Sequence, residues 1–427
     1  MTELEAAISQ LVHREQPALA CPFPLFDEIR QADDALVFSD SLGAWIATRH
    51  DHVLEIMRDT ETWSSRSPSS VGNRANQMQT AMAELATDPE MAGVFASVMD
   101  DRRQAAVLLN ADPPAHVRQR RAVNRAFRPS RIRAMESDVQ QVSDRLMSAI
   151  VPNGRCDFVS EYAVLLPMEI IAKALGVPDD KLLTFKKWSD DLVMPVGNAA
   201  PSVDQMREFL VSSKEFGDYF SALLDERREN PADDIISDVA NAEVDGEPLS
   251  PAEALSMLSQ FLVAGNETTT KLLTNIAFHL ASQPELQKTV RNDRSLVENL
   301  VEEALRFEAP VQGLFRVATT ATNFHGVSIA EGDYVWIVYA AANRDPDMFT
   351  CPNEIQVDRP NASEHVAFGH GEHFCIGARL ARLEAVIAVN AILDHLPKLR
   401  VAPGYEARFE DSFVLRGMRN LDLTFEP

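Results

Sequence analysis

The stretch Phe368-Gly-His-Gly-Glu-His-Phe-Cys-Ile-Gly377 holds one cysteine and three glycines, and strongly helical sequence, ARLARLEAVIAVNAIL, follows it. Glycine permits tight turns and close approach of the backbone to another group. Cys375 is therefore predicted to lie at the end of a glycine-rich loop, at or just before the start of a helix. Helix N–H groups and the helix dipole stabilise a thiolate at such a position.

Three interpretations of this cysteine compete. A lone cysteine is usually a small buried hydrophobe. His370, His373 and Cys375 could begin a zinc site, but zinc prefers four ligands and only the distant Cys351 offers another. The third interpretation is a thiolate bound to haem iron, which pushes electron density toward the iron and favours O–O cleavage.

The stretch resembles the haem-binding loop of the cytochrome P450 family, Phe-x-x-Gly-x-x-x-Cys-x-Gly. Phe368, Gly371, Cys375 and Gly377 fill its four main positions. The resemblance implies that Cys375 ligates the iron of haem b (iron protoporphyrin IX), with Phe368, Gly369 and Gly377 beside the cofactor. It also implies a mainly α fold with minor β sheets, the cytochrome P450 fold. Three further signatures occur in the family's order, so the resemblance covers most of the chain.

A long helix is predicted from the capping box at Ser250 to about Ser282, before Gln283-Pro284. Its middle, Ala264-Gly-Asn-Glu-Thr-Thr-Thr270, is poor helix-forming sequence, since a mid-helix glycine costs about 1 kcal/mol relative to alanine. A threonine hydroxyl can also bond to the carbonyl four residues back and bend the helix. A solvent-exposed polar face would explain the run, but apolar residues flank it on both sides. A stretch of poor helix-forming residues inside an otherwise regular helix often marks a functional site.

The run resembles the family's oxygen-activation motif, Ala-Gly-x-(Asp/Glu)-Thr. The resemblance implies a kinked helix whose Ala264 and Gly265 cross the distal haem face and make room for O₂. It implies that Thr268 hydrogen-bonds the reacting oxygen and that Glu267 relays protons from solvent. A neighbouring acid and alcohol form a short proton relay.

Glu303-Ala-Leu-Arg306 lies in a predicted helix that opens with a second capping box, Ser295-Leu-Val-Glu298, and ends before Pro310. By spacing alone, Glu303 and Arg306 are a surface pair worth about 0.3–0.5 kcal/mol. In the family, such a pair and a later arginine form a buried network beneath the haem. Arg359 matches the third position, and the implied role of all three residues is structural.

The segment from Asp112 to Arg120 resembles the family's third helix and the residues before it. His116 and Arg120 share one helical face at this spacing. The resemblance implies that these two residues, together with Arg316 and His373, bind the haem propionates. Four cationic or hydrogen-bond-donating side chains can form strong, charge-assisted hydrogen bonds with the two propionate carboxylates.

Seven arginines and no acid lie between His116 and Arg133, although the net charge of the chain is −24. A solvated helix face is one explanation. The resemblance implies another, a basic patch on the proximal side, extended by Arg379 and Arg382, that attracts an acidic electron-transfer protein. No flavin or iron–sulfur domain is apparent, so a separate ferredoxin and ferredoxin reductase are the expected electron donors.

By resemblance, the substrate pocket draws on stretches 64–110, 192–200, 263–264, 311–314 and 413–414. The last three are mostly apolar, which indicates a small to medium apolar substrate such as a terpenoid, steroid, fatty acid or aromatic. Gln260 and Gln312 could supply one polar contact. The methionines of 64–110 suit either an adaptable apolar wall or ordinary core. The expected substrate residues are Val263, Ala264, Val311, Leu314, Phe413 and Val414.

Composition sets limits on the protein's class. The strong negative charge argues against a general binder of nucleic acid or anionic membranes. Four scattered cysteines give no disulfide framework, which fits the cytoplasm. The N-terminal residues lack the apolar core of a signal peptide, and no run of 18 apolar residues occurs. No repeat or linker divides residues 1–427, so one monomeric domain is expected.

The expected function is a monooxygenase that inserts one atom of O₂ into an apolar molecule. A haem-thiolate peroxygenase using H₂O₂ is a second reading, but such an enzyme does not need a Glu267–Thr268 relay. A non-catalytic haem sensor is a third, and no signalling segment supports it. Strands are expected near Trp45 and from Tyr334 to Ala340, with shorter ones near Phe413 and Leu421.

Overall fold

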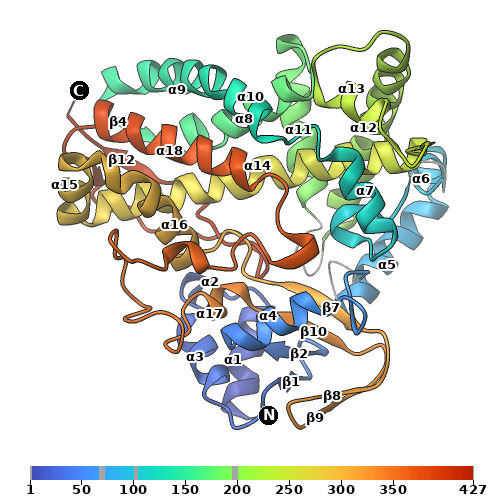
Figure 1. Cartoon of the computed structure of the whole chain (residues 1–427), viewed down its shortest axis with the longest axis horizontal. Coiled ribbons are helices and arrows are strands. Elements are labelled where there is room, and N and C mark those ends of the chain that lie inside the picture. Colours follow the sequence, from blue (N-terminus) through green and yellow to red (C-terminus); the bar gives the residue numbers. More distant parts are fainter. Residues whose placement is uncertain (1, 67–72, 101–103, 195–200, 427) are drawn as a thin grey trace.

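In a computed structural model of the chain, the structure describes residues 2–66, 73–100, 104–194 and 201–426, and the side chains of 73–78 are not described (Figure 1). Parts of the expected substrate stretches, 67–72, 101–103 and 195–200, lie outside the described residues. Helices make up most of the fold, as predicted. None of the described helices is both long and apolar enough to cross a membrane.

The helices and turns of the first half are α1 Glu3–Val12, α2 Gln16–Ala20, α3 Phe23–Arg30, α4 His50–Arg58, α5 Asn73–Thr87, α6 Ala92–Val98, η1 Leu108–Asn110, α7 Ala115–Val123, α8 Pro129–Ala134, α9 Glu136–Ile150, η2 Val151–Asn153, η3 Val159–Ala163, α10 Leu165–Ala174, η4 Asp179–Lys181, α11 Leu182–Val193 and α12 Val203–Glu229. Those of the second half are α13 Ile235–Ala240, α14 Pro251–Ser282, α15 Pro284–Asn292, η5 Arg294–Leu296, α16 Val297–Phe307, α17 Tyr339–Ala342, η6 Ala362–Glu364, η7 Gly371–His373 and α18 Ala378–His395.

The strands are β1 Val37–Ser39, β2 Ala44–Ala47, β3 Trp63–Ser64, β4 Arg155–Asp157, β5 Glu243–Val244, β6 Glu247–Pro248, β7 Leu314–Ala318, β8 Thr322–Phe324, β9 Val327–Ile329, β10 Tyr334–Ile337, β11 Arg400–Val401 and β12 Asp422–Thr424. Five of them form the main sheet, in the order β1-β2-β10-β7-β3. Its neighbours are antiparallel except β2 and β10, which run parallel with Trp336 opposite Ile46.

Helices α9, α10, α14 and α18 pack on one another in a ring, with α14 touching α10 and α18 and with α9 closing the other side. Buried aliphatic side chains from all four helices belong to one large core cluster. Figure 1 shows this helical part above and the main sheet with α1–α4 below. The loop that carries Cys375 enters α18, so the ring fixes the start of that helix relative to α14.

The predicted long helix is confirmed in its bounds and its cap. The Ser250 hydroxyl accepts a hydrogen bond from the Glu253 amide, the Glu253 carboxylate accepts one from the Ser250 amide, and the helix ends at Ser282. The second predicted capping box is wrong. The Asp293 carboxylate accepts hydrogen bonds from the Ser295 amide and hydroxyl, so Ser295 belongs to the turn η5 and α16 begins at Val297.

Two strand predictions need correction in part. The stretch from Tyr334 ends as a strand at Ile337 and turns into the short helix α17. Near Phe413 the chain forms only an isolated bridge between Val311 and Leu415, although β12 does follow Leu421. In stretch 64–110, Met91 is buried in a small cluster with α12, which favours the interpretation as ordinary core at that position.

Candidate active site

Cys375 lies three residues before the first residue of α18, as the loop prediction requires. Its amide donates a hydrogen bond of 2.9 Å to the Phe368 carbonyl, which closes the loop. Gly369 and Gly371 have φ angles of 70° and 67°, a region that favours glycine because it has no Cβ. A Cβ on Gly377 would lie 3.9 Å from the Cys375 sulfur, so the backbone passes close to this thiol.

Burial raises the pKa of the Cys375 thiol. Hydrogen bonds from the amides of Gly377 and Ala378, and the charges of Arg120 and Arg382, act in the opposite direction but do not outweigh burial. The amide groups at the helix start therefore stabilise the Cys375 thiolate as predicted, but burial raises the pKa of the free thiol by more than they lower it. A metal ion that coordinates a thiol removes its proton outright, and the same N–H groups would then stabilise the sulfur charge.

The four residues predicted to bind propionates come together from three segments. His116 lies on α7 and is 2% exposed, and its ring centroid lies 4.1 Å from that of His373 in the cysteine loop. Arg120, one turn later on α7, donates to the Phe374 carbonyl at 2.7 Å. Arg316 is buried on β7 and is close enough to affect the titration of His373.

Among the described residues, the structure shows no carboxylate hydrogen-bonded to the two arginines and two histidines of this cluster. Burial, followed by the charges of Arg316 and His116, lowers the pKa of His373 to about 3. Burial and Arg120 also lower the pKa of His116. The His116 Nδ1 atom is buried and finds no hydrogen-bond partner in the described part of the chain, since the Glu372 carboxylate is 4.0 Å away. Two haem carboxylates would pair with these groups, so the residues fit the cofactor.

Further hydrogen bonds, from residues that were not predicted to belong to the site, hold His373 of this cluster in place. The Ser65 hydroxyl lies 3.0 Å from His373 Nε2. Ser65 is itself held by Asp112, whose carboxylate accepts from the Ser65 amide at 2.7 Å and from the Ser64 hydroxyl at 2.5 Å. Asp112 stands in the stretch that the family resemblance singled out, but nothing in the spacing of Ser64 and Ser65 indicated their partner.

The middle of α14 is helical through the whole polar run, and the kink that the resemblance implies there stays a prediction. The Thr268 hydroxyl donates to the Ala264 carbonyl at 2.8 Å, the local bond that the sequence predicted. Ala264 is exposed, and Val263 and Thr268 are partly so, although buried residues surround them along the helix. A Cβ on Gly265 would contact Ile171 at 3.5 Å, so this glycine packs against α10.

Glu267 lines a pocket of about 430 Å³, to which α11, α14 and the C-terminal segment contribute most of the residues. Its carboxylate accepts a hydrogen bond from the ammonium of Lys271, one turn later on the same helix. Lys271 is buried, with 3% of its side chain exposed. The family resemblance implies a relay role for Glu267, and no role was predicted for Lys271.

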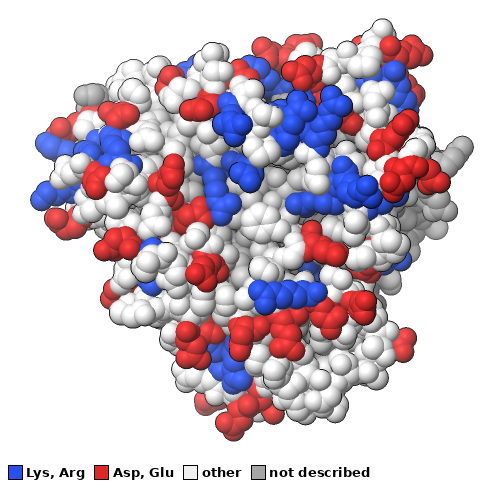
Figure 2. Space-filling model, in the orientation of Figure 1, with Lys and Arg blue, Asp and Glu red and all other residues white. Residues whose placement is uncertain are grey.

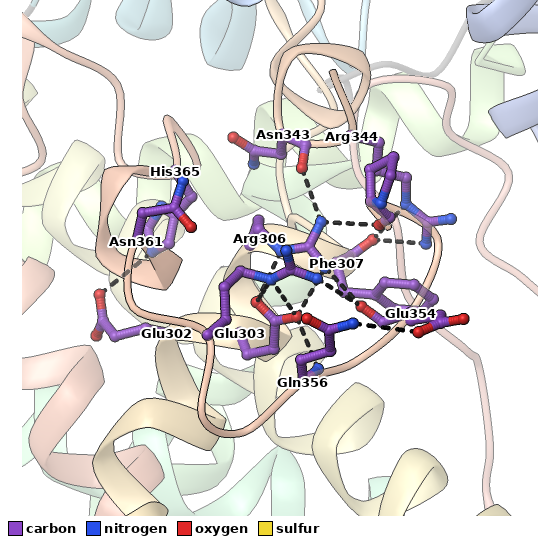
Figure 3. A network of polar contacts seen from close by, with 12 residues as sticks. Glu302, Glu303, Arg306, Phe307, Asn343, Arg344, Glu354, Gln356, Asn361 and His365 are labelled. Atoms are coloured by element: carbon purple, nitrogen blue, oxygen red, sulfur yellow. Dashed lines mark hydrogen bonds and ion pairs between the residues drawn. The ribbon is translucent and has the colours of Figure 1, made fainter. Parts of the chain in front are cut away.

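The predicted structural triad is buried, with both arginines bound to Glu303, and Figure 3 shows Glu303 beside Arg306. Glu303 accepts from Arg306 at 2.7 and 2.8 Å and from Arg359 at 2.9 and 3.1 Å, and all three residues are at most 3% exposed. Arg306 also donates to the carbonyls of Asn343, Pro352 and Glu354. The surface-pair alternative for Glu303 and Arg306 is therefore wrong.

Glu302, the neighbour of Glu303, forms a second ion pair that the sequence did not predict. Arg382 of α18 donates to both its oxygens at 2.6 and 2.7 Å, and His365 lies 3.4 Å from it. Burial alone would raise the pKa of Glu302, but the hydrogen bonds from Arg382 and His365 outweigh it and lower that pKa to about 2. Arg382 also stacks on Phe368, so the pair ties α16 to the cysteine loop.

Ion pairs with acidic residues partly neutralise the seven arginines between His116 and Arg133. Ion pairs engage Arg118 with Glu253, Arg121 with Asp245, Arg125 with Asp238, and Arg131 with Asp233 and Asp238. Arg382 is held by Glu302 and does not extend the patch as expected. Figure 2 shows basic side chains gathered over α7, α8 and the start of α18. Within the described chain, Arg128, Arg133 and Arg379 are exposed and enter no ion pair.

The expected substrate residues divide into two groups. Val311, Leu314 and Val263 are partly exposed, and Ala264 on α14 is exposed. Phe413 and Val414 are only 2% and 3% exposed, and the Phe413 ring packs against Trp336 with centroids 5.4 Å apart. These two residues pack as core residues in this structure, and their role as substrate contacts stays a prediction.

The two expected polar contacts are also engaged. The Gln260 amide donates to the Val107 carbonyl at 2.8 Å and its oxygen accepts from the Leu109 amide. The Gln312 amide donates to the Phe413 carbonyl at 3.0 Å, which links the stretches 311–314 and 413–414. Of the side-chain amide atoms of these two glutamines, the buried Gln312 oxygen has no hydrogen-bond partner among the described residues.

Comparison with known proteins agrees with this geometry. The family model for Cytochrome P450 matches residues 63–403. Cytochrome P450 107B1 of Saccharopolyspora erythraea is 34% identical over 90% of this chain and 89% of its own, and a Steroid C26-monooxygenase of Mycobacterium tuberculosis is 32% identical over 81% and 93%. The crystal structure of CYP109E1 from Bacillus megaterium in complex with testosterone has a TM-score of 0.81 and 27% identity, over 95% of this chain and all of that one.

The family match covers both the cysteine loop and the helix that carries Thr268, and members of this family bind haem. The relatives align along nearly the whole chain, so the likeness extends beyond isolated motifs. The chain belongs to the cytochrome P450 family and is a cytochrome P450 monooxygenase.

Proposed function

We propose that this enzyme hydroxylates or epoxidises a small to medium apolar molecule with O₂, using haem b ligated by Cys375 and two electrons from a separate ferredoxin. The observation that carries the proposal is the partly buried cluster of His116, His373 and two arginines, in which the buried His116 Nδ1 atom has no hydrogen-bond partner among the described residues. Such a cluster suits the two carboxylates of iron protoporphyrin IX. The four free cysteines support a cytoplasmic protein, in which thiols stay reduced.

Bound haem would supply the binding and activation of O₂, and the protein's own groups would hold and tune it. Cys375 would act as the thiolate ligand, with the amides of Gly377 and Ala378 stabilising its charge. The Thr268 hydroxyl can exchange its bond to the Ala264 carbonyl for one to the reacting oxygen, while Glu267 supplies protons from the pocket side.

A steroid or a molecule of similar size is the favoured substrate within the expected classes. The exposed or partly exposed residues Val263, Ala264, Val311 and Leu314 offer an apolar wall. Two of the similar proteins have names or titles that mention steroids, a Steroid C26-monooxygenase and a structure with testosterone. Binding of a steroid panel, followed by spectral titration of the haem protein, is the measurement that separates steroids from terpenoids, fatty acids and aromatics.

The proposed function is tested by a CO-difference spectrum of the reduced, haem-supplied protein. A strongly red-shifted Soret band is expected because a thiolate ligand donates electron density to the iron. No such band in well-folded protein would remove the proposal. Product formation that needs O₂ and a reductant separates a monooxygenase from a peroxygenase, which would work with H₂O₂ alone, and from a non-catalytic sensor, which would form no product.

Replacing Thr268 with alanine is expected to uncouple the reaction. Reductant is still consumed, but product per reductant falls and H₂O₂ is released instead, because general acid–base groups typically contribute about 100-fold or more. Thr274→Ala is the matched control, since the Thr274 hydroxyl makes the same bond to a carbonyl four residues back at 2.8 Å. Full coupling in Thr268→Ala would refute the proposed relay.

Reversing charge at Arg128 and Arg133 is expected to slow electron delivery. Exposed arginines without ion pairs attract an acidic partner, and electrostatic steering raises association rates by about 10-fold or more at low salt. The rate of haem reduction by ferredoxin should therefore fall about tenfold in Arg128→Glu/Arg133→Glu, and the difference should vanish at high salt. Arg400→Glu, an exposed arginine on β11, is the control. An equal effect of Arg400→Glu would show that net charge, not the patch, is responsible.

A further inference from the structure

Glu302 of α16 and Arg382 of α18 form an ion pair beside the cysteine loop. Arg382 donates from Nε and from one terminal nitrogen to the two oxygens of Glu302, at 2.6 and 2.7 Å. The side chains of Glu302 and Arg382 are 15% and 32% exposed, so water reaches the pair only in part. Two parallel, charge-assisted hydrogen bonds fix the guanidinium in one orientation. Glu302 therefore determines where the positive charge of Arg382 lies.

The guanidinium of Arg382 in turn contacts the loop that carries Cys375. It lies over the Phe368 ring, 4.6 Å from the ring centroid. The Phe368 carbonyl accepts the hydrogen bond from the Cys375 amide that closes the loop. Burial raises the pKa of the Cys375 thiol, and the charge of Arg382 is close enough to oppose this effect. Arg382 is thus placed to affect the sulfur in two ways, by holding Phe368 and by its charge.

His365 holds the Glu302 carboxylate from another direction. The Ala367 amide donates to His365 Nδ1 at 3.2 Å, so the neutral ring carries its proton on Nε2, which lies 3.4 Å from Glu302. Figure 3 shows Glu302 and His365 together, to the left of Glu303. Burial lowers the pKa of His365, whereas contacts with Arg382 and His365 outweigh burial and lower the pKa of Glu302 to about 2. At neutral pH this cluster therefore holds one cation, one anion and one neutral ring.

The two charges of the pair act on the sulfur in opposite directions. A thiolate ligand pushes electron density toward haem iron, and the groups around the sulfur tune this effect. The Arg382 charge without its partner would draw electron density from the sulfur, and the Glu302 charge without its partner would do the reverse. The balance between them depends on both residues staying in contact.

We propose that Glu302 is a positioning residue, which holds Arg382 against Phe368 and balances its charge, so that the pair sets the electron density on the Cys375 ligand and the reduction potential of bound haem. This inference rests on the proposed function, in which Cys375 ligates the iron. It gives the two adjacent acids of α16 different tasks, because Glu303 stabilises the fold and Glu302 adjusts the ligand.

The reduction potential of the haem-loaded variants tests the pair, at about pH 8, where an ordinary histidine is neutral. Glu302→Gln leaves the Arg382 charge unbalanced, which favours reduced iron. The ratio of reduced to oxidised haem at a fixed potential should rise about tenfold, which corresponds to about 59 mV. In Arg382→Met, which keeps an apolar stem over Phe368, the ratio should fall about tenfold because Glu302 is unbalanced. The double variant loses both charges and should return close to the parent, since the two effects are coupled.

Two further variants separate charge from packing. Glu302→Asp keeps the charge and should restore a potential close to that of the parent. Glu169→Gln breaks an ion pair with Arg145, in which the Glu169 carboxylate is 19% exposed, and should leave the potential unchanged. Loss of packing alone would shift Glu302→Gln and Arg382→Met in the same direction and the double variant further.

That pattern, or an unchanged potential in Glu302→Gln, would overturn the inference. Failure of the proposed function is distinguishable from this result, because the parent protein itself would then lack the red-shifted band of its CO complex.

Discussion

Cys375→Ser is expected to lose the red-shifted Soret band of the CO complex and all coupled oxygenation, and to remain folded. Serine has nearly the shape of cysteine, but its oxygen is not a thiolate and cannot donate the same electron density to iron. The loop should survive because it is closed by the backbone bond from the Cys375 amide to the Phe368 carbonyl and by Gly369 and Gly371 in left-handed conformations. The measurement is the CO-difference spectrum, with product assayed in parallel.

The other cysteines provide the controls for this prediction. Cys351→Ser changes an exposed thiol, and Cys156→Ser changes a buried one whose pKa burial raises to about 12. Both should keep the red-shifted band, although Cys156→Ser should be less stable. If Cys375→Ser kept the band and one of these lost it, the iron ligand would have been misassigned. Circular dichroism of each variant separates loss of the ligand from loss of the fold.

Motifs whose function depends on local sequence were predictable. The cap of α14, the hydroxyl bond of Thr268 and the glycine loop before α18 all follow from neighbouring residues, and the structure has each of them. Ser295 shows the limit even of this local reasoning, because Asp293 two residues earlier offers a better acceptor and captures it. A local sequence pattern therefore identifies candidate capping residues, but a neighbouring side chain that competes for the same hydrogen bond determines which residue caps the helix.

Contacts between distant segments were not predictable without a family resemblance. Glu302 and Glu303 are adjacent acids in the sequence, yet one binds Arg382 of α18 and the other Arg306 and Arg359. Nothing in their spacing separates these roles, because each depends on which arginine folding brings nearby. The same holds for Lys271, whose burial depends on Gly417 about 150 residues later. The identity of a residue limits its chemistry, and tertiary packing selects its partner.

Arg306→Leu is expected to destabilise the protein by about 3–5 kcal/mol, since it leaves the buried Glu303 charge with one partner fewer. Arg306 makes five hydrogen bonds, two to Glu303 and three to backbone carbonyls of Asn343, Pro352 and Glu354. Leucine satisfies none of these acceptors, and each buried polar group left unpaired costs about 1–3 kcal/mol. The free energy of unfolding is to be measured by denaturant titration at fixed haem occupancy, because bound haem itself stabilises the folded state.

The matched control is Arg228→Leu, which breaks an exposed pair with Asp225 at 2.6 Å. Exposed ion pairs contribute about 0–1 kcal/mol, so this variant should unfold almost as the parent does. A loss below about 1 kcal/mol in Arg306→Leu would mean that the segment 343–359 repacks around Glu303. Because that segment leads directly into the loop of Cys375, the loss of stability should also appear as faster haem release from Arg306→Leu, and not from Arg228→Leu.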